Sequence, residues 1–430
     1  MAEKMTNHEV EVLAIGAGPS NLALAVALEE SGSTGLANNT LILEQYPDVK
    51  WQRNLLLPFA RSQVSFVKDL VTLRNPQSRF SFLSFLHAKG RLDEFVNLGT
   101  FNPFRRELSE YLQWVANNLD HVGIRYNAKG QSVAPRRADD GTVIGWRVTL
   151  TNGDTVDTRD LVVGTGRDAN VPKEFAHLPA DRVIHSTQYS TRIAQYPIDR
   201  PVRVVVIGAA QSAAEMFMAV HKDLPLSQPT LIHRSIGLQN YQTSKFVNEL
   251  FFPSFVNEFH DSPAESRKQI LEEIRLTNYA GLAAPFLDET YSMLYEQKLS
   301  GSQRSAVRSM TEVLEAREED GEVVLELRDR RTGKTDTVRC DLVLLGTGYD
   351  QRMPAMVRHL AGQVGIEDIA VNRRYRVDLG ESTRAGLYLQ GFNEATHGIS
   401  DSLLSVLAHR SHEITTDLLD RRTVSAERSL

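Results

Sequence analysis

The stretch that decides the fold lies near the start of the chain: Val10-Glu-Val-Leu-Ala-Ile15, then Gly16-Ala-Gly18-Pro-Ser-Asn21 and the helical pattern LALAVALEE. A continuous apolar run of this kind is typical of a parallel strand that is covered on both faces. Strand, glycine turn and helix in this order open a βαβ unit. The two glycines predict a tight turn and a close backbone approach to a pyrophosphate at the helix N-terminus. Asn21 departs from the pattern, which has glycine or alanine there.

A second copy of this pattern begins near the middle of the chain. Val202-Arg-Val-Val-Val-Ile207 is followed by Gly208-Ala-Ala-Gln-Ser-Ala-Ala-Glu215 and then MFMAVHKDL. Ala210 replaces the second glycine and adds one methyl group where a phosphate would approach. The repeat predicts two nucleotide-binding folds in one polypeptide.

Two further apolar runs end in glycines, at residues 160–166 and 341–348. We expect the later run to help close the first fold. The predicted fold class is α/β, with two Rossmann-like nucleotide-binding domains and a small, mostly helical segment that could hold a substrate. The predicted ranges are 1–170 with 340–430 for the first domain, 171–238 with 300–339 for the second, and 239–299 for the helical segment.

Two other stretches alternate apolar and polar residues and carry a turn signal. They are residues 145–164, with Asn152-Gly153, and residues 322–346, with Thr332-Gly333. Alternation of this kind around a short glycine turn predicts antiparallel hairpins.

Composition excludes several classes of protein. The 430 residues are 41% hydrophobic and 24% charged, with a net charge of −6, so the chain lacks the basic excess of a nucleic-acid binder. The single cysteine, Cys340, excludes an internal disulfide and lies in an apolar run, where we expect an inert core thiol. The chain shows neither a signal peptide nor a membrane-spanning run, so we expect a cytoplasmic protein with no membrane partner. No metal site is expected.

The residues that follow the second strand of each fold suggest which nucleotide each one binds. Glu44 follows Leu41-Ile-Leu43 and could accept hydrogen bonds from both ribose hydroxyls of an adenosine. We assign this fold to FAD, although its position does not by itself separate FAD from NAD. Arg234 follows Thr230-Leu-Ile-His233, where a cation favours the 2′-phosphate of NADP. The alternative for Arg234 is an ordinary exposed arginine at a strand end.

One flavin fold and one NADPH fold describe a two-nucleotide flavoenzyme. Because one cysteine cannot support a disulfide reductase, the flavin's electrons would pass to oxygen, a quinone or another carrier. Residues His185-Ser-Thr-Gln-Tyr189 match part of the flavin-monooxygenase fingerprint but lack its phenylalanine–glycine part.

The chain resembles the microbial N-hydroxylating monooxygenases that act on the side-chain amine of L-ornithine or L-lysine in siderophore and related biosynthesis. The resemblance covers nearly the whole chain, from Val10 to about Ala408. Its most specific segments are Gln63–Pro76, Asn97–Arg105, Phe246–Glu249, Thr277–Tyr279 and Asn393–Ser405.

The resemblance implies roles for individual residues, and no side chain is assigned as catalytic because the flavin performs the chemistry. Gln63 and Asn278 would position cofactor and substrate. The implied substrate-binding residues are Lys68, for the α-carboxylate, with Asn248, Asn278 and Ser405. The implied FAD residues are Gly16, Gly18, Pro19, Ser20, Glu44, Gln45, Trp51, Gln52, Gln63, Val133, Leu403 and Leu404. The implied NADP residues are Gly208, Gln211, Ser212, Arg234 and Asn278. His185 and His397 are expected to have structural or cofactor-positioning roles.

The implied reaction uses NADPH to reduce FAD, and O₂ then forms a C4a-hydroperoxyflavin that hydroxylates the amine of free L-ornithine to N5-hydroxy-L-ornithine. L-Lysine N6-hydroxylation is the nearest alternative, since one methylene is worth only about 1–3 kcal/mol in a pocket. Another flavin monooxygenase acting on sulfur or a ketone, an NADPH oxidase, and a nucleotide-sensing protein without turnover stay open. The oligomeric state is also open, with a homo-oligomer such as a tetramer as one expectation.

Overall fold

The first sheet is built around β1 (Asn7–Ile15), the run that precedes the first glycine turn. The computed structural model describes residues 7–242, 244–279, 281–380 and 383–427. β1 lies between and parallel to β2 (Thr40–Leu43) and β6 (Thr155–Val163). The seven-stranded sheet has the order β3-β2-β1-β6-β5-β4, with β17 also paired to β6. The other strands are β3 (Gly123–Arg125), β4 (Gly130–Arg137), β5 (Val143–Leu150) and β17 (Gly386–Leu389).

Strand β6 changes partner along its length. Its first half, up to Thr158, pairs antiparallel with β5, and its second half, from Asp160, pairs parallel with β17. The first half confirms the predicted hairpin. The second half ends at Val163 and is followed by Gly164, which confirms that residues 160–166 repeat the strand-and-glycine pattern.

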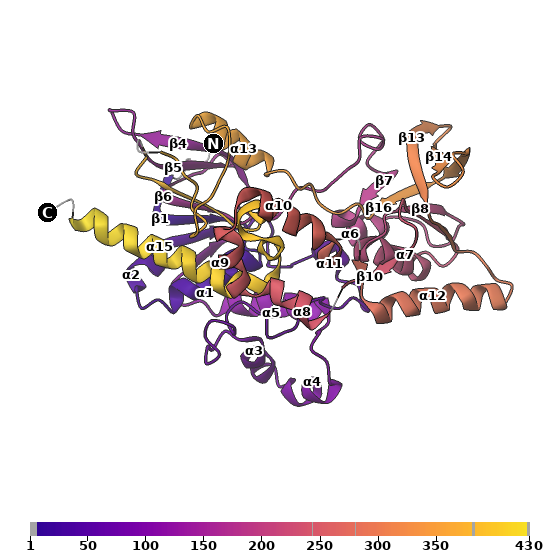
Figure 1. The fold of residues 1–430 in the computed structure, drawn as a ribbon, viewed down its shortest axis with the longest axis horizontal. Helices are drawn as coiled ribbons and strands as arrows, with labels where there is room; N and C mark the ends of the chain where they lie inside the picture. The colour runs from indigo at the N-terminus through magenta and orange to yellow at the C-terminus, as the bar shows by residue number, and fades with distance from the viewer. Residues whose placement is uncertain (1–6, 243, 280, 381–382, 428–430) are drawn as a thin grey trace, which may run out of the picture.

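Helices cover both faces of this sheet (Figure 1). One face carries α1 (Pro19–Glu29), α5 (Arg105–Asn117) and α15 (Leu407–Glu427), which contribute to an aromatic-rich core cluster. The opposite core cluster includes α13 (Ala355–Gln363) with β4 and β5. The smaller helices α2 (Thr34–Asn38), α3 (Phe82–Ala88) and α4 (Leu92–Leu98) contribute to the first, aromatic-rich cluster, whereas the 3₁₀ turn η1 (Arg53–Leu55) packs in the core of the second domain through Leu55.

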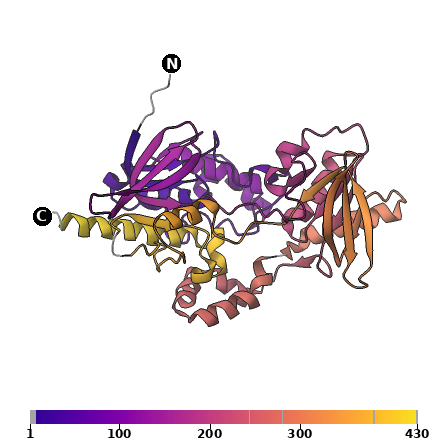
Figure 2. The same ribbon diagram turned by 90° about the horizontal axis from the view of Figure 1, so that it is seen from above.

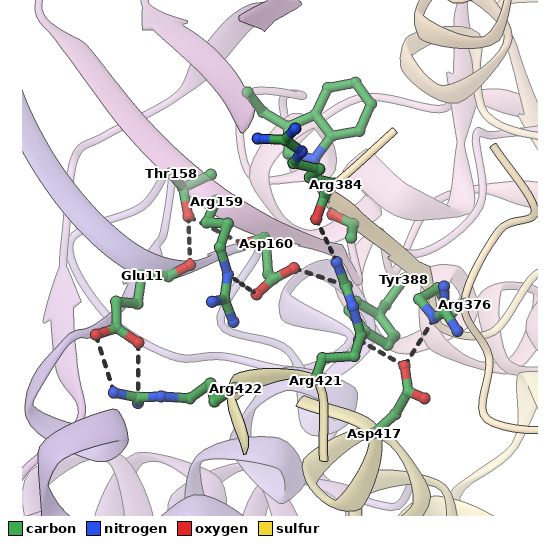
Figure 3. Close-up of polar contacts among 12 residues, drawn as sticks. Glu11, Thr158, Arg159, Asp160, Arg376, Arg384, Tyr388, Asp417, Arg421 and Arg422 are labelled. Carbon is green, nitrogen blue, oxygen red and sulfur yellow. Dashed lines mark hydrogen bonds and ion pairs between the residues drawn. The ribbon is translucent and has the colours of Figure 1, made fainter. Parts of the chain in front are cut away.

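A buried charge cluster fixes the C-terminal helix to the sheet (Figure 3). Asp160, at the point where β6 changes partner, is fully buried and accepts from Arg159 Nε at 2.9 Å and from Arg421 Nη1 of α15 at 2.8 Å. Tyr388 of β17 donates to Asp417 of α15 at 2.7 Å. Because a buried carboxylate needs a compensating cation, this arrangement ties α15 to β6 and β17.

The second sheet is parallel and has five strands in the order β12-β9-β8-β16-β7. Its centre is β8 (Arg203–Ile207), which leads through the second glycine turn into α7 (Gln211–Asp223). The other elements are β7 (Val183–His185), η2 (Ser186–Gln188), α6 (Tyr189–Ile193), β9 (Gln228–Ile232), β12 (Ala306–Arg308) and β16 (Leu342–Leu345). Both Rossmann-like sheets predicted from the sequence are therefore present.

The predicted boundary at residue 340 is wrong for one strand. β16 (Leu342–Leu345) pairs with β8 and β7 in the second sheet, whereas β17 supplies the corresponding strand of the first. All four residues of β16 are buried, and a strand covered on both faces has the same pattern in either sheet.

An antiparallel sheet of β13 (Thr311–Glu319), β14 (Glu322–Asp329) and β15 (Thr335–Cys340) packs on the second sheet and confirms the other predicted hairpin. Cys340 is 1% exposed in this core, and burial raises the pKa of its thiol to about 12, as expected for an inert cysteine.

The segment between residues 239 and 299 is mostly helical; its first helices project at the lower edge of the molecule in Figure 2, and its last helix runs along the second domain. Its elements are β10 (Gln239–Asn240), α8 (Lys245–Asn248), η3 (Glu249–Phe251), α9 (Pro253–Asp261), α10 (Ala264–Glu273), α11 (Arg275–Asn278), β11 (Gly281–Leu282) and α12 (Ala284–Leu299). Residues of α8 to α11 pack against Ile399 and Leu403, beside α14 (Glu394–His397), η4 (Ile399–Ser402) and η5 (Leu404–Val406). α12 differs from the prediction, because Met293 and Leu294 pack against the core of the second domain.

Within the described residues, no helix is long and apolar enough to cross a membrane. The same residues contain no group of three or more histidine, cysteine or acidic side chains that could hold a metal ion.

Candidate active site

The first glycine turn has the geometry of a pyrophosphate cradle. Gly16 has φ +91° and donates its N–H to the Leu43 carbonyl at 2.8 Å, and a Cβ at Gly16 would lie 3.0 Å from the Gly164 carbonyl oxygen. Gly18 precedes α1, and a Cβ there would have its nearest neighbour at 3.9 Å. The space in front of α1 is therefore open, which suits a phosphate group at a helix N-terminus.

Asn21, the departure from the dinucleotide pattern, has a structural explanation. Its amide nitrogen donates to the carbonyls of Ile15 at 2.9 Å and Gly16 at 2.7 Å, and its amide oxygen accepts from Gln390 at 2.7 Å. A Cβ at Gly164 would lie 2.7 Å from the Asn21 amide nitrogen. Asn21 thus fills the space above Gly164 and holds the glycine turn with hydrogen bonds.

A buried arginine on α15 supports the same turn, and the sequence did not reveal it. Arg410 is 1% exposed and donates to Gln390 at 3.2 Å, to the Asp401 carboxylate at 3.0 Å and to Ser20 Oγ at 2.8 Å. Ser20 is one of the implied FAD residues, and Pro19 beside it begins α1. Arg410 therefore connects the C-terminal helix to the first glycine turn.

Glu44 lies at the end of β2, as predicted. Its two carboxylate oxygens accept the N–H groups of Ala17 at 2.8 Å and Tyr46 at 3.0 Å, and the residue is 9% exposed. Each oxygen can accept a second hydrogen bond, so ribose hydroxyls could still be bound.

The remaining implied FAD residues lie in different surroundings. Gln52 has φ +54° and its side-chain oxygen accepts from Tyr349 at 3.4 Å, while Trp51 packs against the first core. Val133 of β4 is 2% exposed, which leaves little side-chain surface for an adenine. Three others are exposed or half-buried: Gln45, Leu403 and Leu404.

The structure brings together two of the implied substrate residues. Lys68 Nζ lies 3.4 Å from Ser405 Oγ and 4.8 Å from the centre of the Phe252 ring. Lys68 and Leu404 also line one small cavity. Burial lowers the pKa of the Lys68 ammonium, which an anionic ligand would counteract.

The other two implied substrate residues lie on the helical segment. Asn248 ends α8 and is exposed, and Asn278 ends α11 and is half-buried. Within the described residues, no hydrogen bond joins either asparagine to Lys68. Val247 and Tyr279, their neighbours in the chain, belong to the cluster that packs against Leu403, so both asparagines lie near the loop that contains Leu403.

Gln63 is exposed and shares a hydrogen bond with Tyr241 of the loop that follows β10. Burial raises the pKa of Tyr241 to about 12, although this hydrogen bond acts in the opposite direction. Gln63 thus lies at the boundary between the first domain and the helical segment.

The second glycine turn is more tightly packed than the first. Gly208 has φ +140°, and a Cβ there would lie 2.4 Å from the Gly346 carbonyl oxygen. Ala210 is the N-cap of α7 with extended backbone, and Ser212 lies in the first turn of that helix. The side chain of Gln211 donates to Glu215 at 2.9 Å and accepts the N–H of Ala283 at 3.2 Å.

Arg234 is exposed and follows β9 by two residues. The position that matches Glu44 of the first fold is His233, whose Nδ1 lies 2.9 Å from Ser235 Oγ. Burial lowers the pKa of His233. The exposed guanidinium of Arg234 is free to meet an anion at the edge of the sheet.

The two histidines singled out in the sequence are buried and bonded to backbone. His185 Nε2 lies 2.9 Å from the Gly348 carbonyl, and burial lowers its pKa. His397 stacks on Tyr375 at 4.0 Å between ring centroids, and burial lowers its pKa to about 4. These contacts support the structural roles expected for them.

Two further groups of polar residues have no signal in the sequence. Arg105 of α5 and Glu215 of α7 form a buried ion pair between the domains. Glu394 accepts from Tyr279 at 2.6 Å and from Arg167 at 3.2 Å, which connects α11 to α14. Both contacts join residues more than 100 positions apart, so no local pattern could have revealed them.

Comparison with known proteins identifies the family. Residues 8–351 match the family described as L-lysine 6-monooxygenase/L-ornithine 5-monooxygenase. The chain is 37% identical over 416 residues to the L-ornithine N(5)-monooxygenase of Pseudomonas aeruginosa, a match that covers 95% of this chain and 93% of that protein.

Solved structures agree with this assignment. The ornithine N-hydroxylase of Kutzneria sp. 744, with reduced FAD, NADP⁺ and L-ornithine, has a TM-score of 0.90 and 32% identity, covering 96% of this chain and 100% of that one. The L-lysine 6-monooxygenase of Pseudomonas syringae has a TM-score of 0.84 and 30% identity, covering 96% and 99%. The resemblance noted in the sequence is thereby confirmed: the chain belongs to the L-lysine 6-monooxygenase/L-ornithine 5-monooxygenase family.

Proposed function

We propose that this protein uses FAD, NADPH and O₂ to hydroxylate the side-chain amine of free L-ornithine, giving N5-hydroxy-L-ornithine. The observation that carries the proposal is the placement of Lys68 Nζ 3.4 Å from Ser405 Oγ. This puts a half-buried cation beside the loop that contains Leu403 and Leu404. A free amino acid offers one carboxylate for such a cation, and its side-chain amine would then extend toward the proposed FAD site.

The first glycine turn would hold the FAD pyrophosphate in front of α1, with Glu44 near the ribose. The second turn would hold NADPH in front of α7, with Arg234 near the 2′-phosphate. When bound, FAD accepts a hydride from NADPH and activates O₂ for transfer of one oxygen atom to nitrogen. The protein's part is to bind, orient and exclude water.

Lys68 and the neighbouring Phe252 would have two tasks. The ammonium of Lys68 would bind the α-carboxylate through a charge-assisted hydrogen bond. The attacking nitrogen must be neutral, and with a lysine-like pKa of about 10.4 its deprotonation at pH 8 costs roughly 3.3 kcal/mol. The centre of the Phe252 ring lies 4.8 Å from Lys68 Nζ, and the Lys68 charge together with this aromatic surface would disfavour a second ammonium.

The direct test is a product assay with both candidate amino acids. Purified protein with FAD, NADPH and O₂ is given L-ornithine or L-lysine, and the hydroxylated amino acid is measured by mass spectrometry. We expect kcat/KM for L-ornithine to exceed that for L-lysine by at least about tenfold, because one methylene changes binding by about 1–3 kcal/mol. A preference for L-lysine would favour the alternative, and NADPH oxidation without an amine-dependent product would reject both.

Replacing Lys68 tests the observation itself. Lys68→Ala should weaken L-ornithine binding by about 1.5–3 kcal/mol, which is roughly 10- to 150-fold, because a charge-assisted contact is lost. Flavin reduction by NADPH should survive, so that the electrons pass to O₂ and form hydrogen peroxide. The control is Lys89→Ala, an exposed lysine after α3. Unchanged L-ornithine affinity in Lys68→Ala would remove this residue from the site.

We also propose a homo-oligomer, with a tetramer as one option. The support is an exposed apolar stripe on α12 formed by Tyr291, Tyr295 and Leu299, which are 72%, 60% and 76% exposed. Apolar groups gathered on a surface are a feature of protein contacts. Light scattering of the purified protein measures the mass directly, and a monomer at all concentrations would reject this part of the proposal.

A further inference from the structure

A buried ion pair joins the two nucleotide-binding domains. Arg105 begins α5 in the first domain, and its two terminal nitrogens donate to the two carboxylate oxygens of Glu215 at 2.8 Å and 2.7 Å. Arg105 is 7% exposed and Glu215, on α7 of the second domain, is 1% exposed. The pair therefore has the parallel, two-bond geometry that fixes direction as well as distance.

The surroundings of the pair belong to both domains. Arg105 also donates to the Leu55 carbonyl at 2.8 Å, and its backbone N–H donates to the Ala60 carbonyl at 2.8 Å. Leu55, Leu57 and Ala60 come from the first part of the chain but pack in the core cluster of the second domain. Arg105 thus holds the segment that carries the contact between the domains.

Glu215 passes this contact on to the second nucleotide site. It lies four residues after Gln211, whose amide nitrogen donates to Glu215 at 2.9 Å and whose amide oxygen accepts the Ala283 N–H at 3.2 Å. Gln211 is the first residue of α7 and directly follows the second glycine turn. A continuous set of hydrogen bonds therefore runs from α5 through α7 to the start of α12.

A buried ion pair is a poor source of stability compared with apolar packing, since both charges lose water. What it provides is a defined geometry, and this geometry matters where two domains must present two reactants to each other. Hydride transfer requires the reacting atoms at about 3–3.5 Å, and a displacement of about 1 Å can cost a hundredfold in rate. α7 carries the turn that would hold NADPH, so a change in its direction moves the nicotinamide.

We propose that the Arg105–Glu215 pair is a positioning device for the reductive half-reaction, which fixes α7 relative to the FAD domain and so sets the approach of the nicotinamide to the flavin. This rests on the proposed function, because it needs both nucleotides in their assigned sites. Arg105 and Glu215 act through Gln211 and the glycine turn and are positioning residues.

The test compares Glu215→Gln and Arg105→Lys with a control that removes a buried charge inside one domain. Asp160→Asn is that control, since Asp160 is fully buried and paired with Arg421 within the first domain (Figure 3). Three properties are measured: the limiting rate of anaerobic flavin reduction at saturating NADPH, the unfolding temperature, and hydrogen exchange of a peptide that contains the Ala283 amide in FAD-free protein.

We expect Glu215→Gln to slow flavin reduction at least tenfold and to accelerate exchange at Ala283 at least tenfold, because one amide oxygen cannot accept from both Arg105 nitrogens and Gln211 as the two carboxylate oxygens do. Arg105→Lys keeps the charge and loses the paired geometry, so its rate should lie between Glu215→Gln and the unaltered protein. Asp160→Asn should lower the unfolding temperature and leave the reduction rate and the Ala283 exchange within twofold.

Reduction rates within twofold of the unaltered protein in both Glu215→Gln and Arg105→Lys would overturn the proposal and leave a purely stabilising pair. Should Glu215→Gln fail to fold, an unchanged rate in Arg105→Lys would overturn it equally. Failure of the unaltered protein to reduce its flavin with NADPH would instead reject the proposed function, which makes the two failures distinguishable.

Discussion

The two glycine turns of this protein can be compared residue by residue. In the first, Asn21 lies above Gly164, and the three atoms nearest to a Cβ at Gly164 would all belong to the Asn21 side chain, at 2.7–2.9 Å. In the second, Ala213 occupies the equivalent place above Gly346, and a Cβ there would meet the Cα, Cβ and N atoms of Ala213 at 2.5–2.7 Å. The Asn21 side chain therefore separates α1 from the Gly164 backbone and holds the two together by hydrogen bonds, whereas the backbone of α7 packs directly against Gly346.

This difference shows how each turn is connected to the rest of the molecule. The amide of Asn21 links the first turn through Gln390 to Arg410 of α15, so that turn depends on the C-terminal part of the chain. The close packing at Ala213 places α7 firmly on the second sheet, and Glu215, two residues later, faces the other domain. The first turn is thus stabilised from within its domain, and the second is oriented from outside it.

The largest expected effect follows from the closer packing of the second turn. Gly346→Ala should destabilise the protein by about 3 kcal/mol or more, because backbone atoms of α7 would have to move. Gly164→Ala should cost less, about 1–2 kcal/mol, since the Asn21 side chain can rotate away at the expense of its hydrogen bonds. Urea unfolding measures both values.

Gly362→Ala is the matched control, because no atom lies within 4 Å of the added Cβ and the residue is inside α13. Alanine there should be neutral or stabilising by up to about 1 kcal/mol. A larger cost for Gly164→Ala than for Gly346→Ala would contradict the comparison.

The second effect concerns the hydrogen bonds of Asn21. Asn21→Ala should destabilise the first domain by about 2 kcal/mol and weaken FAD binding, because the Gln390 amide is left buried without its partner. Asn21→Asp should be at least as harmful at neutral pH, since a carboxylate would face the Ile15 and Gly16 carbonyls. FAD fluorescence titration and urea unfolding test this, and an Asp variant as stable as the unaltered protein would show that the amide donors are dispensable.

The two domains can also be compared through one buried histidine in each. His397, on the FAD side, has a pKa lowered to about 4, with burial as the main cause, partly offset by Asp401 and reinforced by His260 and Arg410. In the unfolded chain the pKa of this histidine is about 6.5. As the pH falls, the unfolded chain therefore takes up the proton at a higher pH than the folded protein does. Stability from this group is present above about pH 6.5 and is lost as the pH falls toward 4.

At pH 5 the loss relative to pH 7 should reach about 2 kcal/mol. His397→Gln should reduce this dependence on pH in urea unfolding. His233→Gln, in the second domain, is the comparison, because burial lowers the pKa of His233 as well. An unaltered slope between pH 7 and pH 5 in His397→Gln would reject this origin of acid sensitivity.

Much of this fold could be predicted because its signals are local. The apolar runs, the glycine turns and the hairpins are each contained in fewer than 30 residues, and all were found in the sheets expected of them except β16. The sequence does not assign this strand correctly because a central strand is buried on both faces in either sheet. Burial alone does not indicate which neighbouring strand it pairs with.

The site was less accessible to prediction. Lys68 and Ser405 were selected through family resemblance, and their proximity confirms that the two segments meet. Arg105, Glu215 and Arg410 are charged residues on helices, where a sequence pattern ordinarily indicates a solvated face. Their partners are up to 390 residues away in the chain, so only the folded structure reveals that they are buried.

The smallest expected effect concerns the preference of the second fold for NADPH over NADH, which depends on the residue that follows its second strand. At the end of β2, Glu44 is 9% exposed and bonded to two backbone N–H groups, while Arg234 after β9 is exposed. An exposed arginine is screened by water, so its contact with a 2′-phosphate should be worth about 1.4 kcal/mol. Arg234→Ala should therefore raise KM for NADPH about tenfold and leave KM for NADH nearly unchanged.

Arg308→Ala is the control for this experiment. Arg308 ends the neighbouring strand β12 and pairs with Asp336 at 2.9 Å, so its loss removes a nearby positive charge without removing the proposed phosphate contact. If the general field of the sheet edge attracted NADPH, the two variants would behave alike and the effect would disappear at high salt. A contact specific to the 2′-phosphate instead predicts that only Arg234→Ala changes the ratio of the two KM values, because NADH lacks the group that Arg234 would bind.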